Sequence, residues 1–164
     1  LSATKLNLKI KGSDTNIEKI VDIGFVGQPT NVNTDLIKNH IMKGEIPVIA
    51  PLGIDTNNNI FNINADTAAG FIAGTLQASK LLLLTDVAGV LDKDNNLISS
   101  LSLDNAIKII DEKFILGGMK PKILTCIEAM KNGVNKSTIL DGRIPHSVVL
   151  ELFTEHGIGT QIYS

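Results

Sequence analysis

The chain has 164 residues, 43% of them hydrophobic and 20% charged, with a formal net charge of −2. This is enough apolar material for one core, and we expect residues 1–164 to form a single domain. The near-neutral charge argues against a surface that binds nucleic acid or an anionic membrane, and no apolar run is long enough for a membrane span. The single cysteine, Cys126, excludes an intramolecular disulfide, and we expect no protein ligands for a metal.

The first part of the chain predicts two strands and a helix. Leu6, Leu8 and Ile10 alternate with polar residues, which is the period-two pattern of a strand with one buried face. Residues 20–26 predict a second strand. A short helix is expected over residues 34–43, because its apolar residues fall on one side and a glycine follows it.

From residue 46 onward, strand and helix patterns alternate. We expect strands over 46–50, 60–63, 81–85 and 137–140, a last short strand ending at Tyr163, and helices over 65–78, 104–111, 119–132 and 145–153. The run 81–85 is apolar on both faces, as in a parallel sheet that is covered on both sides. The alternation predicts an α/β fold, a three-layer αβα sandwich with a mainly parallel sheet. In such folds ligands bind beyond the carboxyl ends of the strands.

Three polar residues meet where one predicted strand ends and a helix begins. Asn62 and Asn64 lie on the same side of the strand end, and Asp66 falls in the first helical turn, where the helix dipole favours a carboxylate. This arrangement suits a polar ligand. It also suits ordinary N-capping by Asn64, and the segment alone favours that simpler interpretation.

A glycine pair precedes another predicted helix. Gly117 and Gly118 allow a backbone to approach a phosphate closely and leave amides free to donate. Lys122 lies near the helix start, where a cation is unfavourable without an anionic partner, and this mismatch indicates a bound anion. A glycine-rich loop with solvated lysines is the alternative, and it is favoured for this segment alone. Neither common glycine-rich nucleotide motif is present.

The remaining candidate residues give weaker signals. Thr85 and Asp86 follow a buried strand and suit either a nucleotide base or ribose, or a polar turn closed on itself. His146 and Glu151 lie five residues apart on the last predicted helix, and on their own they predict two exposed polar residues. Cys126 lies among apolar helix positions and is expected to be a small buried hydrophobe.

Taken in order, these segments resemble the C-terminal part of the acetylglutamate kinases, in the amino acid kinase family. The resemblance runs from Val21 to Ile162 and rests on the segments 22–27, 46–51, 62–69, 83–91, 117–122, 141–146 and 150–160. It implies transfer of the γ-phosphoryl group of ATP to the γ-carboxylate of N-acetyl-L-glutamate, the second step of arginine biosynthesis. It also implies that Mg²⁺ bridges the ATP phosphates and that no cofactor is tightly bound.

The resemblance gives each candidate a role. Asn62 would bind the acetylglutamate backbone, and Asp66 would hold catalytic lysines in place without acting as a base, since the attacking carboxylate is already ionised. Lys122 would stabilise the ATP phosphates. The nucleotide would lie against Thr85, Asp86, Gly89, Gly117 and Gly118. Such cations and amides neutralise charge and position the reactants, as phosphoryl transfer requires.

The family's N-terminal lobe has no counterpart in this sequence, which begins at Leu1. That lobe carries a lysine in a glycine-rich loop, a Gly-Gly loop for the transferring phosphate, and an arginine that grips the substrate. We therefore expect residues 1–164 to be the C-terminal ATP-binding lobe with part of the substrate site, and to be inactive alone.

Further properties follow from the resemblance. In arginine-inhibited members the last helix and the following loop form an effector site, which His146, Glu151 and Gly157 match by position; Glu151 would pair with the amino group of L-arginine. A homo-oligomer (dimer or hexamer), a PII signalling protein as partner, and a cytoplasmic or plastid-stromal location are consistent with it. Two alternatives stay open: another amino acid kinase (for carbamate, aspartate, glutamate or uridylate), or a non-catalytic nucleotide- or arginine-sensing module.

Overall fold

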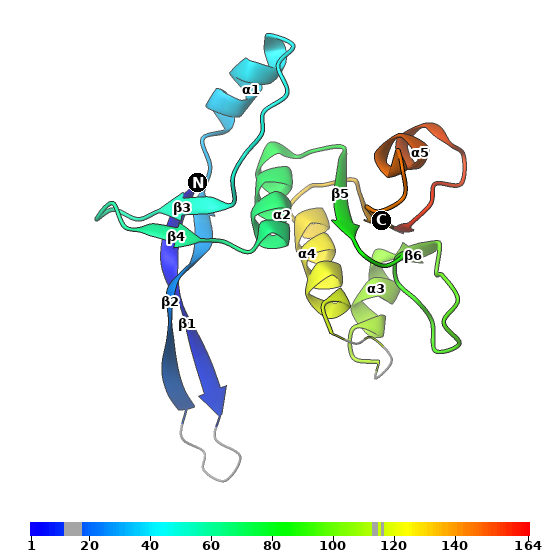
Figure 1. Ribbon diagram of the computed structural model, residues 1–164, viewed down its shortest axis with the longest axis horizontal. Helices are drawn as coiled ribbons and strands as arrows, with labels where there is room; N and C mark the ends of the chain where they lie inside the picture. Colours follow the sequence, from blue (N-terminus) through cyan, green and yellow to red (C-terminus); the bar gives the residue numbers. More distant parts are fainter. Residues whose placement is uncertain (12–17, 113–114, 116) are drawn as a thin grey trace. The chain divides into compact units, whose positions relative to one another are not determined.

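The computed structural model describes residues 1–11, 18–112, 115 and 117–164, and its contacts divide the chain into two compact units, Leu1–Ala68 and Ala69–Ser164 (Figure 1). Each unit has its own cluster of buried hydrophobic side chains. The single domain expected over residues 1–164 stays a prediction, because a division by contacts does not measure whether either part folds alone.

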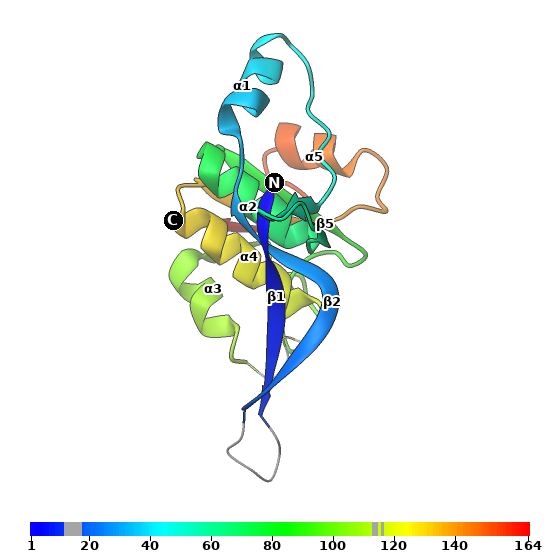
Figure 2. The ribbon, with the colours of Figure 1, turned by 90° about the vertical axis from the view of Figure 1, so that its left-hand side faces the viewer.

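Four strands build most of the first unit. They are β1 (Ser2–Lys11), β2 (Glu18–Asn31), β3 (Leu52–Ile54) and β4 (Ile60–Asn62), in the closed spatial order β1-β2-β4-β3. β1 and β2 form a long antiparallel ribbon, blue in Figure 2, and parallel pairings of β1 with β3 and of β2 with β4 close the set. Ala3, Phe61 and Ile63 are buried in its core. Both predicted strands are confirmed, while the side chains of Leu8 and Ile10 lie outside the described ones.

A short helix follows β2. α1 (Thr34–Met42) begins after Asn33, whose side chain accepts a hydrogen bond from the Leu36 amide at 2.9 Å. A side-chain oxygen at this position satisfies a backbone donor that the helix itself leaves without a partner. The helix predicted over residues 34–43 is therefore confirmed to within one residue.

The strand predicted over residues 46–50 is wrong. This segment is not part of any strand in the described sheets, and Ile46 and Val48 are 90% and 97% exposed. The strand β3 starts only at Leu52, whose amide donates to the Ala50 carbonyl at 2.8 Å in a tight turn. An apolar run forms a buried strand only where another strand pairs with it, and Pro47 removes one of the amides that such pairing needs.

The second unit is built on a four-stranded sheet. Its strands are β5 (Lys80–Thr85), β7 (Lys136–Asp141), β8 (Thr160–Tyr163) and β6 (Ser100–Ser102), in the order β5-β7-β8-β6. The pairings β5–β7 and β6–β8 are parallel and β7–β8 is antiparallel, so the sheet is mainly parallel, as predicted. β6 was not predicted, because three residues are too few for a periodic pattern.

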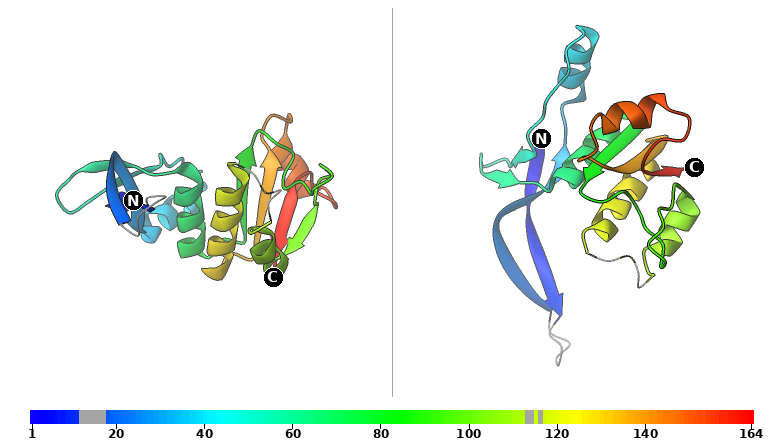
Figure 3. Two further views of the ribbon diagram at one scale, coloured as in Figure 1. Left: turned by 90° about the horizontal axis from the view of Figure 1, so that it is seen from below. Right: turned by 45° about the vertical axis from the view of Figure 1, so that its right-hand side comes forward.

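Helices cover both faces of this sheet. They are α3 (Leu103–Ile109), α4 (Met119–Lys131) and α5 (Ser147–Phe153). A further helix, α2 (Ala65–Leu76), starts in the first unit and continues in the second, where Gly70 lies against Thr125 of α4. On one face, Leu83 and Ile139 pack with Ile123 of α4 in the main buried cluster. On the other face, Lys80 and Thr138, which alternate with those residues, contact α5 (Figure 3). The predicted three-layer α/β sandwich is confirmed in this unit.

Small differences remain at the end of the chain. α5 begins at Ser147 and not at Pro145, because His146 has a φ of +59° and cannot continue a right-handed helix. Within the described residues, no helix is long and apolar enough to cross a membrane.

Candidate functional site

Two loops leave the sheet of the second unit side by side. Thr85 at the end of β5 pairs with Asp141 at the end of β7, and the Gly142 amide donates to the Thr85 carbonyl at 2.8 Å. α4 leads into β7 through the turn at residues 132–135, so its N-terminus lies at the same edge (Figure 1). The segments 85–89 and 117–122, both predicted to bind nucleotide, are thus brought to one edge of one sheet. This is where ligands of parallel sheets bind.

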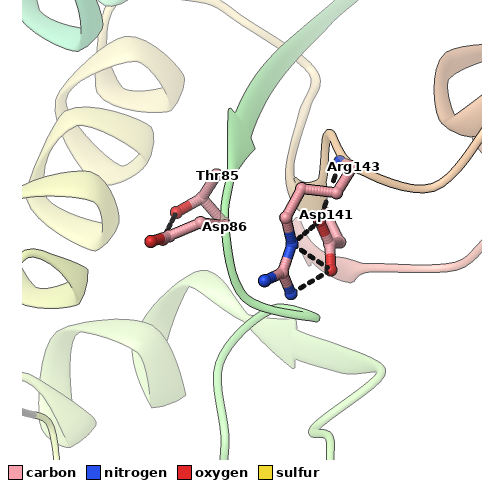
Figure 4. A network of polar contacts seen from close by, with 4 residues as sticks. All are labelled: Thr85, Asp86, Asp141 and Arg143. Carbon is pink, nitrogen blue, oxygen red and sulfur yellow. Dashed lines mark hydrogen bonds and ion pairs between the residues drawn. The ribbon is translucent and has the colours of Figure 1, made fainter.

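The first of these loops starts with two polar side chains in contact. Thr85 Oγ1 donates to Asp86 Oδ1 at 3.3 Å (Figure 4). This hydrogen bond satisfies no backbone group, so the polar turn closed on itself, the alternative interpretation, also stays a prediction. The nucleotide-binding roles of both residues stay predictions.

An ion pair at this edge was missed in the sequence. Arg143 donates through Nε and Nη2 to both carboxylate oxygens of Asp141, at 3.0 and 2.8 Å (Figure 4). The Arg143 hydrogen bonds hold the pKa of Asp141 below its usual range, and in return Asp141, with a smaller effect from Asp86, raises the pKa of Arg143. The available signal was an acid and an arginine two residues apart directly after a buried strand.

The first turn of α4 contains no acidic side chain and no side-chain cap. Gly118 is the N-cap of this helix, without a side-chain hydrogen bond. Lys120 and Lys122 lie in this turn, and Lys120 is 3.7 Å from Asp111. Amide donors at a helix start, beside lysines, form a positive site that suits a phosphate.

A small cavity adjoins both segments. Its volume is about 230 Å³, and its lining is mainly hydrophobic and includes Val87, Gly89 and Met119. Only glycine fits at position 89, because a Cβ there would lie 2.6 Å from Thr160 Oγ1 and 2.8 Å from Leu97. Cavities that hold a whole small ligand are usually ~300–1,000 Å³, so this one suits a part of a nucleotide, such as its base.

The candidates of the first unit lie where β4 ends and α2 begins. Asn62 is the last residue of β4, and Asp66 lies in the first turn of α2. The Asn64 side chain accepts a hydrogen bond from the Thr67 amide at 3.1 Å, which confirms capping by Asn64. Substrate binding by Asn62 and positioning by Asp66 stay predictions.

Glu151 is not the exposed residue that the sequence predicted. It is 6% exposed, and its carboxylate accepts hydrogen bonds from Lys80 Nζ at 2.8 Å, Thr138 Oγ1 at 3.0 Å and the Ile158 amide at 3.0 Å. Burial alone raises the pKa of Glu151, but Lys80 and the two further donors outweigh it and hold that pKa below the ordinary value. Glu151 is therefore a buried anion that connects α5 to β5 and β7.

A polar cavity of about 470 Å³ opens beside this carboxylate. Its lining includes Glu151, Lys80 and Lys136, and also Gly157. Gly157 has a φ of +60°, and a Cβ there would collide with the Glu151 carboxylate. His146 is exposed and does not belong to this lining. Of the three predicted effector residues, the structure brings together Glu151 and Gly157.

In the described part of the chain, no group of three or more His, Cys, Asp or Glu side chains is placed to hold a metal ion. Cys126 is fully buried and packs in the main hydrophobic cluster, as predicted.

Comparison with known proteins identifies relatives over nearly the whole chain. It is 52% identical to the acetylglutamate kinases of Rhodospirillum centenum, over 162 residues, and of Brucella anthropi, over 160 residues. These alignments cover 99% and 98% of this chain but 53% and 54% of those proteins, so the chain spans about half the length of the curated relatives it matches.

Solved structures and a family profile point to the same group of related proteins. An N-acetylglutamate synthase from Neisseria gonorrhoeae, complexed with coenzyme A and L-arginine, matches with a TM-score of 0.87 and 29% identity over 99% of this chain and 36% of that one. A Giardia carbamate kinase matches with a TM-score of 0.66 over 99% of this chain and 55% of that one, and at 21% identity it shows the fold alone. Residues 1–141 match the amino acid kinase family profile. Since that match covers most of the sequence, the chain belongs to the amino acid kinase family.

Proposed function

We propose that this chain is part of an acetylglutamate kinase, which transfers the γ-phosphoryl group of ATP to the γ-carboxylate of N-acetyl-L-glutamate. The observation that carries this proposal is 52% identity over 99% of the chain to a protein of that name. The site supports it, because a helix N-terminus without an acidic side chain, with two lysines in its first turn and an apolar cavity beside it, suits a nucleotide.

In this proposal the protein mainly positions the reactants and neutralises charge. Lys122 and the first amides of α4 hold the ATP phosphates, with Gly117 and Gly118 allowing close approach. The cavity beside Gly89 takes the base. The acceptor carboxylate is already ionised, so no general base is needed, and Asp66 has an orienting role. Mg²⁺ bound together with the nucleotide would supply further positive charge at the phosphates that Lys122 and the α4 amides hold.

A second candidate function comes from the synthase. Its structure matches this chain with a TM-score of 0.87, so a similar fold also occurs in a protein named as an N-acetylglutamate synthase, which is not a kinase. The second candidate function is therefore that this chain is part of such a synthase. The higher identity to the kinases, 52% against 29%, favours the kinase.

We also propose that the cavity beside Glu151 binds L-arginine as an effector. The buried Glu151 carboxylate would pair with the amino group of L-arginine, and Lys80 and Lys136 would supply positive charge for the carboxylate of L-arginine. The synthase that matches this chain is described as complexed with L-arginine. His146 is left out of this proposal. A homo-oligomer, a PII protein as partner and a cytoplasmic or plastid-stromal location stay predictions.

The test is acyl-phosphate formation by the full-length protein with Mg-ATP, measured with N-acetyl-L-glutamate and, for comparison, with carbamate, aspartate and glutamate. We expect turnover with N-acetyl-L-glutamate only. Lys122→Ala is expected to lower kcat about 10²–10³-fold, as for other groups that stabilise transition-state charge. Lys131→Ala, in the last turn of the same helix, is the matched control and is expected to keep kcat within about threefold. Equal effects of both substitutions would remove Lys122 from the catalytic assignment.

A further inference from the structure

The backbone of Val90, directly after the candidate nucleotide loop, is held from two sides. Its amide donates to Thr160 Oγ1 at 2.8 Å, and its carbonyl accepts from the Ile98 amide at 2.9 Å. Val90 and Thr160 are both completely buried. A buried amide needs an acceptor, and here the acceptor is a side chain 70 residues away in the sequence.

The same hydroxyl also fixes the neighbouring Gly89. A Cβ at position 89 would lie 2.6 Å from Thr160 Oγ1 and 3.1 Å from the Thr160 amide nitrogen, so the loop passes directly over Thr160. Gly89 lines the 230 Å³ cavity together with Met119, the first residue of α4. The position of one cavity wall therefore depends on the Thr160 side chain.

Thr160 is itself held in a fixed place. It is the first residue of β8 and pairs with Ile139 of β7 in the antiparallel register. β7 in turn pairs with β5 along six residues, from Lys80 to Thr85. The loop that leaves β5 is thus fixed at its start by the sheet and at its end by Thr160. Its course between these points is constrained before any ligand arrives.

We propose that Thr160 is a positioning residue of the nucleotide site, whose hydroxyl holds the Val90 amide and so keeps Gly89 in place as the wall of the base cavity. This rests on the proposed function, because it assigns the 230 Å³ cavity to the nucleotide. Replacing the hydroxyl by a methyl group leaves a buried amide without its acceptor. The loop then moves to find another partner, and the cavity that it lines is lost in part of the molecules.

Three substitutions in the full-length protein separate the hydroxyl from the shape of the side chain. Thr160→Val keeps the shape of the side chain and removes the hydroxyl that accepts from the Val90 amide. Thr160→Ser keeps that hydroxyl, and Thr160→Ala removes it from a side chain close in size to serine. Ser137→Ala is the matched control: Ser137 is also fully buried, in the adjacent strand, and its hydroxyl has no hydrogen-bond partner among the described residues. For each variant, Mg-ADP affinity is measured by calorimetry, together with the KM values for ATP and for N-acetyl-L-glutamate.

The hydroxyl is expected to act on the nucleotide alone. Thr160→Val weakens Mg-ADP binding and raises the KM for ATP about tenfold, as the loss of a buried acceptor implies, with the KM for N-acetyl-L-glutamate within about twofold. Thr160→Ser and Ser137→Ala bind Mg-ADP like the unmodified protein. If Thr160→Val does not fold, the comparison of Thr160→Ala with Thr160→Ser carries the same test.

Two results overturn the proposal in different ways. If the unmodified protein binds no Mg-ADP, the proposed function and the role of Thr160 fall together. If it binds Mg-ADP, and the folded variants without the hydroxyl bind it equally tightly or shift both KM values equally, only the role of Thr160 is wrong.

Discussion

The ion pair between Lys80 and Glu151 gives a stability prediction whose magnitude depends on pH. The Glu151 side chain is 4% exposed and the Lys80 side chain 21%, so Lys80→Met leaves a buried carboxylate without its cation. Breaking a buried ion pair by removing one partner costs about 3–5 kcal/mol. Lys80 is partly solvated, and Thr138 and the Ile158 amide still donate to the carboxylate, so we expect a smaller loss of about 2–3 kcal/mol near pH 7.

The pH dependence follows from the lowered pKa of Glu151. A carboxylate whose folded pKa lies below the ordinary 4.5 stabilises the fold above that pH, and this contribution disappears as the pH falls through the folded pKa. In Lys80→Met, burial is less opposed and the pKa of Glu151 rises. The stability difference between the two proteins is therefore largest near neutral pH and shrinks in acid, where Glu151 is protonated in both.

The assay is urea denaturation of the full-length protein, followed by circular dichroism from about pH 7 to about pH 3. Lys136→Met is the matched control, because Lys136 is the register partner of Lys80 in the adjacent strand but is exposed; its cost is expected to stay under about 0.5 kcal/mol. A loss for Lys80→Met that is the same at every pH, or no larger than for Lys136→Met, would refute the reasoning.

Two further predictions concern other sites. Gly89→Ala places a Cβ 2.6 Å from Thr160 Oγ1 and is expected to weaken Mg-ADP binding at least about tenfold, measured by calorimetry. An unchanged Mg-ADP affinity would show that Gly89 does not line the nucleotide site. Asn33→Ala removes the N-cap of α1 and is expected to lower the free energy of unfolding by about 1 kcal/mol in denaturation experiments; no change would show that the Leu36 amide is equally well satisfied by water.

Local patterns were sufficient for most elements of the fold. The strand over residues 81–85 and the helix over 119–132 were predicted to within about one residue. The strand is a short continuous apolar run, the helix has apolar residues at helical spacing, and both end at turn-forming residues. The same reasoning failed at residues 46–50. There the apolar run was present, but in the described structure Ile46 and Val48 are exposed and no strand pairs with them. Periodicity reports which side chains are suited to burial and not whether a neighbour covers them.

The candidate site shows where local reasoning stops. Helix spacing on its own predicted that Glu151 is exposed, because the pattern of α5 contains no sign of Lys80, which is 71 residues away in sequence. The loop at residues 85–91 was recognised as a candidate site, but its support by Thr160 was not. In both cases the decisive partner comes from another strand of the sheet, and its identity depends on strand order and register. Those are properties of the assembled sheet, which no short window of the sequence contains.

The end of the chain illustrates how few residues carry such long-range support. The Ile158 amide donates to Glu151, and two residues later Thr160 Oγ1 accepts from the Val90 amide. One short segment before and within β8 therefore fixes a wall of the polar cavity beside Glu151 and a wall of the apolar cavity beside Gly89. Because the two contacts use different groups, a backbone amide and a side-chain hydroxyl, they are separable by substitution. Thr160→Val is expected to weaken nucleotide binding without changing the pH dependence of stability, and Lys80→Met is expected to do the reverse.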